Sequence, residues 1–129
     1  VILGDLTDAF SPYGEMVDFA AVKELLAKGA VIACSSCGDH SASGKESLLW
    51  NGIQWYKHGI EANQVLRAMT STPARLLGVD RLTGSLEVGK NADMVVWTHN
   101  PICSYRAAVK AAYIKGENIL EKERYASCW

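Results

Sequence analysis

The sequence has no apolar run of the roughly 18–20 residues that a membrane-spanning helix needs. Its N-terminus has no basic segment and carries Asp5, so we expect no signal peptide. Lysine and arginine do not cluster, and the formal net charge is −1. Nucleic acid and anionic membranes are therefore poor candidate partners. These absences favour a cytoplasmic protein that acts on a small molecule.

Cysteine is also scarce, with four residues in 129. That number does not suggest a small disulfide framework, and free thiols in a cytosolic protein are the simplest expectation. The composition is 49% hydrophobic and 21% charged, which is enough for an ordinary core and argues against disorder. The chain opens with Val1 inside an apolar, strand-like run, so we expect it to be part of a longer protein.

Residues 1–78 show alternating strand and helix patterns. The predicted elements are a strand end at 1–4, a loop at 5–14, a helix at 18–28, a strand at 30–34, a loop at 35–44, helices at 46–58 and 61–70, and a short helix at 74–77 opened by Pro73. Gly29, Gly59 and Gly78 follow the helices, where C-caps are expected. The short apolar run at 30–34 indicates a strand buried on both faces, as in a parallel sheet.

Residues 79–129 have a different character. A turn-rich segment at 84–90 holds a predicted short strand at 86–88, and longer strands are expected at 92–97 and 108–114. Residues 115–118 are predicted to form a hairpin turn that leads to residues 119–120. The change in pattern predicts a domain boundary between 1–78 and 79–129.

The stretch 34–40, CSSCGDH, follows the predicted parallel strand, where α/β proteins carry catalytic groups. Asp39 could bind a divalent metal and accept a proton from an attacking water. Cys34 and Cys37 could instead form a redox CxxC pair. Both thiols with His40 could bind a structural zinc if Cys103 supplied a fourth ligand. The fourth interpretation is a polar loop with two unreactive thiols.

The other histidines and the tryptophans favour structural roles. His58 lies at a predicted helix end, where a surface cap is expected, and His99 follows a strand in a turn that should face solvent. Trp50 and Trp55 are expected to lie in a core or an interface.

Two motifs carry a family resemblance. Residues 68–78, AMTSTPARLLG, are similar to the amidohydrolase pattern A-x-T-x-N-P-A-x-x-L-G, and residues 84–97, GSLEVGKNADMVVW, resemble G-S-L-x-x-G-K-x-A-D-x-V-V-W. Residues 109–118 are similar to the final strand and turn of that family. By themselves, the glycines of the second motif permit tight turns and its apolar residues build a strand, so it is expected to be structural.

The resemblance, strongest to imidazolonepropionase-like enzymes, implies an α/β fold. Residues 1–78 would be the C-terminal portion of a (β/α)₈ metal-dependent hydrolase barrel, and residues 79–129 would belong to its small β-sandwich. The barrel strand at 30–34 would be the eighth, which makes Asp39 the expected metal ligand and catalytic residue. The family places this Asp directly at the strand end, so Cys37 is the alternative ligand, and His40 would support the site from the second shell.

The implied activity is metal-dependent hydrolysis of a C–N bond, in a cyclic amide or a peptide-like substrate, with zinc as the expected metal. The histidine ligands of the family have no counterpart here, so the chain alone is expected to be inactive. A different interpretation is a non-catalytic remnant that assembles with a partner or a second copy of itself, which would cover the open edge of the barrel. A CxxC redox protein is the third.

Overall fold

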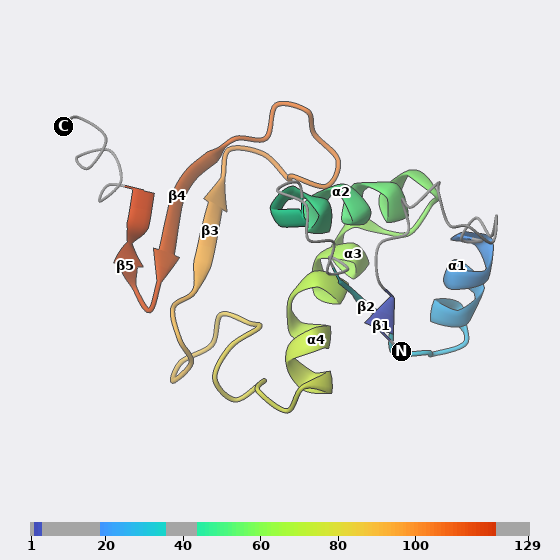
Figure 1. The fold of residues 1–129 in the computed structure, drawn as a ribbon, viewed down its shortest axis with the longest axis horizontal. Helices are drawn as coiled ribbons and strands as arrows, with labels where there is room; N and C mark the ends of the chain where they lie inside the picture. The colour runs from blue at the N-terminus through green and yellow to red at the C-terminus, as the bar shows by residue number, and fades with distance from the viewer. Residues whose placement is uncertain (1, 4–18, 36–43, 121–129) are drawn as a thin grey trace.

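The computed structural model describes residues 2–3, 19–35 and 44–120 (Figure 1). In chain order the elements are β1 (Ile2–Leu3), α1 (Phe19–Ala27), β2 (Ala33–Cys34), α2 (Gly44–Lys57), α3 (Ala62–Met69), α4 (Ser71–Leu76), β3 (Met94–Trp97), β4 (Val109–Ile114) and β5 (Glu117–Asn118). Helices dominate the first part and an antiparallel sheet the second, so the mixed α/β class predicted from the sequence is confirmed. Within these residues, no helix combines the length and apolar character needed to cross a bilayer.

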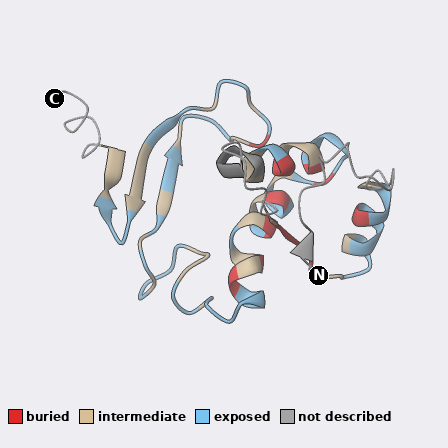
Figure 2. Ribbon diagram, viewed as in Figure 1, coloured by how far each residue is buried: buried red, intermediate tan, exposed pale blue. Residues whose placement is uncertain are grey.

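A parallel strand pair lies among the helices. β1 and β2 run in the same direction, with Ile2 opposite Ala33. Ile32, Ala33 and Cys34 are consecutive and only 2%, 1% and 5% exposed. Successive side chains of a strand point to opposite faces, so consecutive burial means that both faces are covered (Figure 2). The prediction of a doubly buried parallel strand is confirmed for Ala33 and Cys34, whereas residues 30–32 precede the strand and Val31 is 50% exposed.

Three helices end in the same hydrogen-bonded turn. After α2, the N–H of Ile60 donates to the carbonyl of Trp55 at 3.2 Å. The N–H of Gly59 donates to the carbonyl of Tyr56 at 2.9 Å. This pair of bonds is the Schellman motif, and the same pair closes α1 at Gly29 and α4 at Gly78. All three glycines have positive φ angles. The predicted C-caps are therefore confirmed.

The starts of α3 and α4 differ in how they are capped. Glu61 caps α3, because its carboxylate accepts from the N–H groups of Asn63 at 3.1 Å and Gln64 at 3.2 Å. α4 begins at Ser71, so the prediction that Pro73 opens it was wrong by two residues. Pro73 still lies in the first turn, where a backbone N–H has no partner within the helix and its absence costs nothing.

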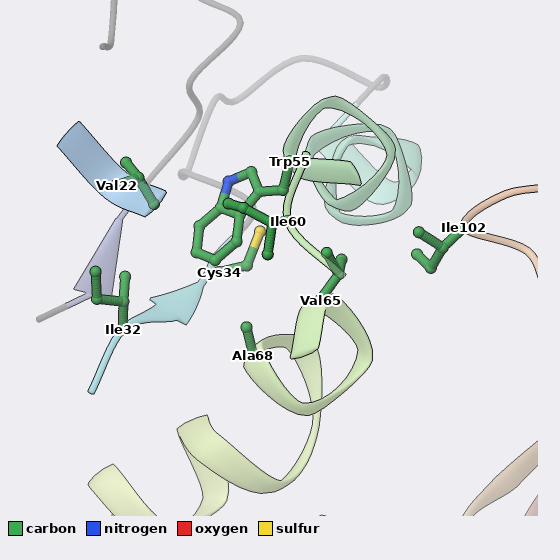
Figure 3. Close-up of a cluster of buried hydrophobic side chains, with 8 residues drawn as sticks. All are labelled: Val22, Ile32, Cys34, Trp55, Ile60, Val65, Ala68 and Ile102. Atoms are coloured by element: carbon green, nitrogen blue, oxygen red, sulfur yellow. The ribbon is translucent and has the colours of Figure 1, made fainter. Parts of the chain in front are cut away.

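The buried side chains gather into one cluster between β2 and the helices (Figure 3). Its members are Val22, Ile32, Cys34, Trp55, Ile60, Val65, Ala68 and Ile102. Helices α2 and α3 approach closely at Gly52, where a Cβ would come within 2.6 Å of the Met69 sulfur. Ile102 comes from the loop between β3 and β4, which reaches back to α2 in Figure 1, and it is only 2% exposed.

The predicted strand at 86–88 is absent from the structure. The segment between Gly84 and Lys90 is a series of bends and turns, and Leu86 and Val88 lie in solvent. Within residues 2–3, 19–35 and 44–120 no strand is hydrogen-bonded to this segment, and hydrogen bonds among nearby side chains hold it instead. The alternation of its apolar residues predicted a strand, but a strand also needs a second strand to pair with, and the described residues provide none here.

The second part of the chain forms an antiparallel sheet in the order β3-β4-β5. The strand predicted at 92–97 begins at Met94, and the one predicted at 108–114 begins at Val109. The hairpin turn is shorter than predicted, because only Lys115 and Gly116 form it while residues 117–118 pair as β5. Both turn residues have positive φ, +50 and +83, as in the two-residue hairpin turns that match the twist of strands.

Candidate functional site

The end of β2 is the described part of the predicted site. Cys34 closes the strand and Ser35 follows it. Cys37, Asp39 and His40 lie outside the described residues, so their assigned roles stay predictions. The structure nevertheless shows what supports the strand from which they emerge.

Asn51 of α2 is that support, and the sequence reasoning missed it. Its side chain is fully buried, and its Nδ2 donates to the carbonyl of Ser35 at 3.4 Å. Its buried Oδ1 has no hydrogen-bond partner among the residues that the structure describes. The signal was present in the sequence: Asn51 lies three residues after Leu48 and four before Trp55, on the apolar face of the predicted helix.

An unpaired buried acceptor of this kind costs about 1–3 kcal/mol. One helical turn further on, the buried Nε1 of Trp55 likewise has no hydrogen-bond partner within the described part of the chain. Residues four apart in a helix share a face, so the side chains of Asn51 and Trp55 both lie on the inner face of α2. Figure 3 shows the Trp55 ring lying beside Cys34.

The two described cysteines differ in environment. Cys34 belongs to the hydrophobic cluster and is 5% exposed, whereas Cys103 lies on the surface of the loop after β3. Reactive thiols are generally partly exposed and near positive charge, and a thiol in an apolar interior is typically inert. The position of Cys34 therefore disfavours the redox interpretation of the CxxC motif.

No three His, Cys, Asp or Glu side chains come together in the part of the chain that the structure describes. The structural-zinc interpretation also requires Cys37 and His40, which lie outside the described residues, so it stays a prediction.

His58 and His99 lie where they were predicted. The Nδ1 of His58 is 2.8 Å from the carbonyl of Gln54 at the end of α2, and the ring stacks on Phe19 with centroids 3.9 Å apart. The ring is exposed, so His58 is a surface cap that also joins α2 to α1. His99 is exposed beside the hydroxyl of Thr98.

The two tryptophans of α2 differ in environment. Trp55 is fully buried in the cluster, which confirms its expected core position, whereas Trp50 is 52% exposed and its place in an interface stays a prediction. The Nζ of Lys57 lies 5.6 Å from the centroid of the Trp50 ring, a cation–π contact across two turns of the helix.

The motif at residues 84–97 folds around a small polar network. Ser85 donates to Glu87 at 2.7 Å, and the Nζ of Lys90 reaches the Ser85 hydroxyl at 2.6 Å and the Glu87 carboxylate at 3.3 Å. The hydrogen bond from Ser85, followed by the hydrogen bond and charge of Lys90, lowers the pKa of the Glu87 carboxyl below its ordinary value. These bonds close the turn, and the predicted structural role of the motif is confirmed.

The same motif holds the β4–β5 hairpin. Asp93 accepts from the backbone N–H of Lys115 at 2.8 Å, and the carbonyl of Ala92 accepts from the N–H of Gly116 at 3.1 Å. Both hairpin-turn residues are therefore bonded to the start of β3. The Asp93 carboxylate of the motif therefore holds this hairpin turn.

The two motifs that carry the family resemblance touch each other. A Cβ on Gly84 would overlap the Cβ of Ala74 and stand 3.2 Å from the carbonyl oxygen of Thr70. Ala74 and Thr70 belong to the first motif and Gly84 to the second. The shared pattern therefore records a packing contact between α4 and the loop that follows it.

Known proteins match the chain over this whole region. The sequence pattern of the amidohydrolase family matches residues 16–119. A 5-methylthioadenosine/S-adenosylhomocysteine deaminase of Moorella thermoacetica is 34% identical over 85 residues, which cover 60% of this chain and 20% of that protein. The crystal structure of an amidohydrolase from Thermotoga maritima superposes with a TM-score of 0.75 and 28% identity, over 89% of this chain and 29% of that one.

The chain thus spans a fifth of the similar deaminase and under a third of the similar structure. Its matched segment includes both motifs, the β2–α2 region and the antiparallel sheet. This chain belongs to the amidohydrolase family.

Proposed function

We propose that this chain is the C-terminal part of a cytoplasmic, metal-dependent amidohydrolase that hydrolyses a C–N bond in a small molecule. One observation carries the proposal: the segment 35–43, with its carboxylate, leaves the C-terminal end of a doubly buried parallel strand within the family match. In barrel enzymes that end of the strands is where the catalytic groups lie. Family membership adds the hydrolytic chemistry.

In this proposal residues 1–78 are the last part of a (β/α)₈ barrel and residues 79–129 belong to a small β-sandwich. The parallel pair β1–β2 and the helices that follow support the first assignment, and the antiparallel sheet β3-β4-β5 supports the second. The partial coverage of the similar proteins supports the idea that further strands come from elsewhere in the enzyme. A closed barrel requires them, and the chain alone is expected to be inactive.

Asp39 is the proposed catalytic residue, as the acceptor of a proton from the water that attacks the substrate. Cys37 is the competing occupant of that position, and His40 would support it. A divalent metal such as zinc, when bound, would make a water molecule nucleophilic near neutral pH. The family resemblance implies that its histidine ligands would come from other parts of the enzyme.

The activity named for the deaminase relative bears on the class of bond. A deaminase acts at the C–N bond of an amino group, which supports C–N hydrolysis in general. It does not favour a cyclic amide over an amino substituent, so we propose the broader class, a carbon–nitrogen bond of a small molecule.

The test uses the full-length protein and two single variants. Asp39→Asn is expected to abolish hydrolysis of a panel of cyclic amides, dipeptides and aminopurines, because the proton acceptor is removed. Cys37→Ala is expected to keep it. Metal content is measured alongside by elemental analysis. Unchanged activity and metal in Asp39→Asn, with loss of both in Cys37→Ala, would transfer the role to Cys37.

A non-catalytic remnant that assembles with a partner is the second candidate. Large apolar side chains on the described surface favour a covering surface of some kind, among them Leu77 at 68% and Leu82 at 59% exposure. Native mass spectrometry with metal analysis separates the two candidates. A metal-free oligomer of this chain without hydrolytic activity would support the remnant.

A further inference from the structure

The end of α4 and the turn after it carry a group of exposed apolar side chains. Leu76 is 43% exposed, Leu77 68%, Val79 37% and Leu82 59%. We call these four residues the α4 patch. In Figure 2 the end of α4 and the start of the following loop are coloured mostly as exposed. Single exposed apolar residues are ordinary on protein surfaces, whereas a concentrated group of them marks an interaction site.

Hydrogen bonds hold the backbone of the α4 patch in one conformation. The N–H of Val79 donates to the carbonyl of Ala74 at 2.9 Å, and the N–H of Leu82 donates to the carbonyl of Val79 at 2.9 Å. The carbonyl of Leu82 accepts from the N–H of Asn91 at 2.8 Å, which joins this turn to the far end of the following loop. The apolar side chains therefore project from an ordered segment, and a second surface is needed to remove them from water.

The charged residues around the patch favour a protein surface as its cover. Arg75 and Arg81 flank it, and residues 58–89 contain no lysine. Protein interfaces are enriched in arginine and depleted in lysine, and a guanidinium group is more weakly hydrated than an ammonium group. Asp80 is the one acidic residue between the two arginines. No carboxylate of the described residues forms an ion pair with either arginine, so both can face carboxylates on an opposing surface.

The similar structure indicates where such a surface comes from. This chain superposes on the Thermotoga maritima amidohydrolase with a TM-score of 0.75 but corresponds to 29% of that chain, so over two thirds of it has no counterpart here. α4 and the loop after it lie within the family match at residues 16–119. In Figure 1 they form one margin of the described chain, where further polypeptide can approach.

We propose that the α4 patch is an interface with another part of the same enzyme. An apolar segment from outside residues 1–129 covers the four side chains, and carboxylates beside that segment face Arg75 and Arg81. This inference rests on the proposed function in one respect, that the enzyme contains more polypeptide than this chain. It adds the surface at which the two parts meet and the chemistry of the opposing side.

The experiment measures how fast a thiol reagent labels an introduced cysteine in the full-length protein, with peptide mapping by mass spectrometry to distinguish it from the natural cysteines. Leu77→Cys reports on the patch. Glu24→Cys is the matched control, because the Glu24 side chain is 66% exposed, close to the 68% of Leu77, and forms an ion pair with Lys28 on the surface of α1. Leu77→Cys should be labelled at least about 100-fold more slowly than Glu24→Cys, because only a local opening exposes a covered site. Leu82→Cys serves as a second site if Leu77→Cys does not fold.

A charge reversal tests the chemistry of the opposing surface. Arg81→Glu, added to Leu77→Cys, should speed labelling by about 5- to 10-fold, because like charges then meet across the interface. Arg81→Lys keeps the charge and should leave the rate within about 2-fold. Arg106→Glu reverses an exposed arginine in the loop between β3 and β4 and should have no effect. Equal labelling rates with Arg81→Glu and Arg106→Glu would overturn the assigned charge pairing.

The remaining outcomes separate this inference from the proposed function. Protection of Leu77→Cys in a monomer, identified by native mass spectrometry, supports the interface. Protection that occurs only in an oligomer and is lost on dilution would place a second copy on the patch and overturn it, as would equal labelling of Leu77→Cys and Glu24→Cys. A protected patch in a protein that hydrolyses none of the substrate panel removes the proposed function alone. An active protein with an unprotected patch removes this inference alone.

Discussion

Replacing Gly84 by alanine tests the contact between the two family motifs. Gly84 has φ +92, a region that costs a non-glycine residue roughly 1–2 kcal/mol. The new Cβ would also overlap the Cβ of Ala74, and backbone atoms of Thr70 and Ser71 lie at 3.2 and 3.3 Å. Overpacking of this kind costs about 1–3 kcal/mol, so Gly84→Ala should lower the free energy of unfolding by about 2–5 kcal/mol.

Gly89 provides a matched control in the same motif. Its φ is +94, but a Cβ there would meet nothing within 4 Å. Gly89→Ala should therefore cost only the backbone contribution of roughly 1–2 kcal/mol. Urea unfolding of both variants in the full-length protein measures the difference. Equal destabilisation would refute the packing contact.

A double variant locates the clash. Ala74→Gly removes the methyl group that Gly84→Ala would strike, at a helix-propensity cost of about 1 kcal/mol. Gly84→Ala combined with Ala74→Gly should be more stable than the sum of the two single losses predicts. Strict additivity would mean that the strain lies in the backbone alone.

Two further predictions concern the polar bonds of the same region. Asp93→Ala should lower the free energy of unfolding by about 0.5–1.5 kcal/mol, because the N–H of Lys115 loses its acceptor. Amide hydrogen exchange at Lys115 should then become faster. Asp93→Asn keeps an acceptor oxygen and should retain most of the protection from exchange. For Glu87, the folded-state pKa lies below the unfolded value of about 4.3, so its stabilising contribution is present above that pH and is lost as the pH falls through the folded pKa. Glu87→Gln should remove this acid-dependent loss from the unfolding midpoint measured between about pH 6 and 3, and identical pH profiles for variant and wild type would contradict the assignment.

The sequence predicted the helices well because their signals are local. Gly29, Gly59 and Gly78 end helices through hydrogen bonds made within a few residues, and such signals can be read from the chain itself. The parallel strand at 30–34 was predictable because a short, continuous apolar run has few other uses.

The prediction errors arose where the structure depends on pairing between strands. Leu86 and Val88 follow the alternation of a strand, yet none of the described strands is hydrogen-bonded to them. The hairpin turn was placed too long because β5 pairs through Glu117 and Asn118, two polar residues with weak strand propensity. Pairing partners are distant in sequence, and local patterns do not contain them.

The candidate site was only partly predictable for a similar reason. The strand end could be located from Cys34 and the polar residues after it. Asn51 could not be linked to it, because the bond to Ser35 spans sixteen residues and depends on how α2 packs against the strand. A polar residue on an apolar helix face indicated that a partner existed without saying where.

The position of Ile102 affects how this protein unfolds. It lies beyond β3 in sequence, yet its side chain fills space beside Gly52 in the helical core. Cleavage of the chain between residues 78 and 79 would separate Ile102 from the helical core. A cavity would then remain beside Val65 and Met69. The two parts are therefore expected to melt in a single cooperative transition, with hydrogen exchange in α2 and in the β3–β4 loop governed by the same opening event.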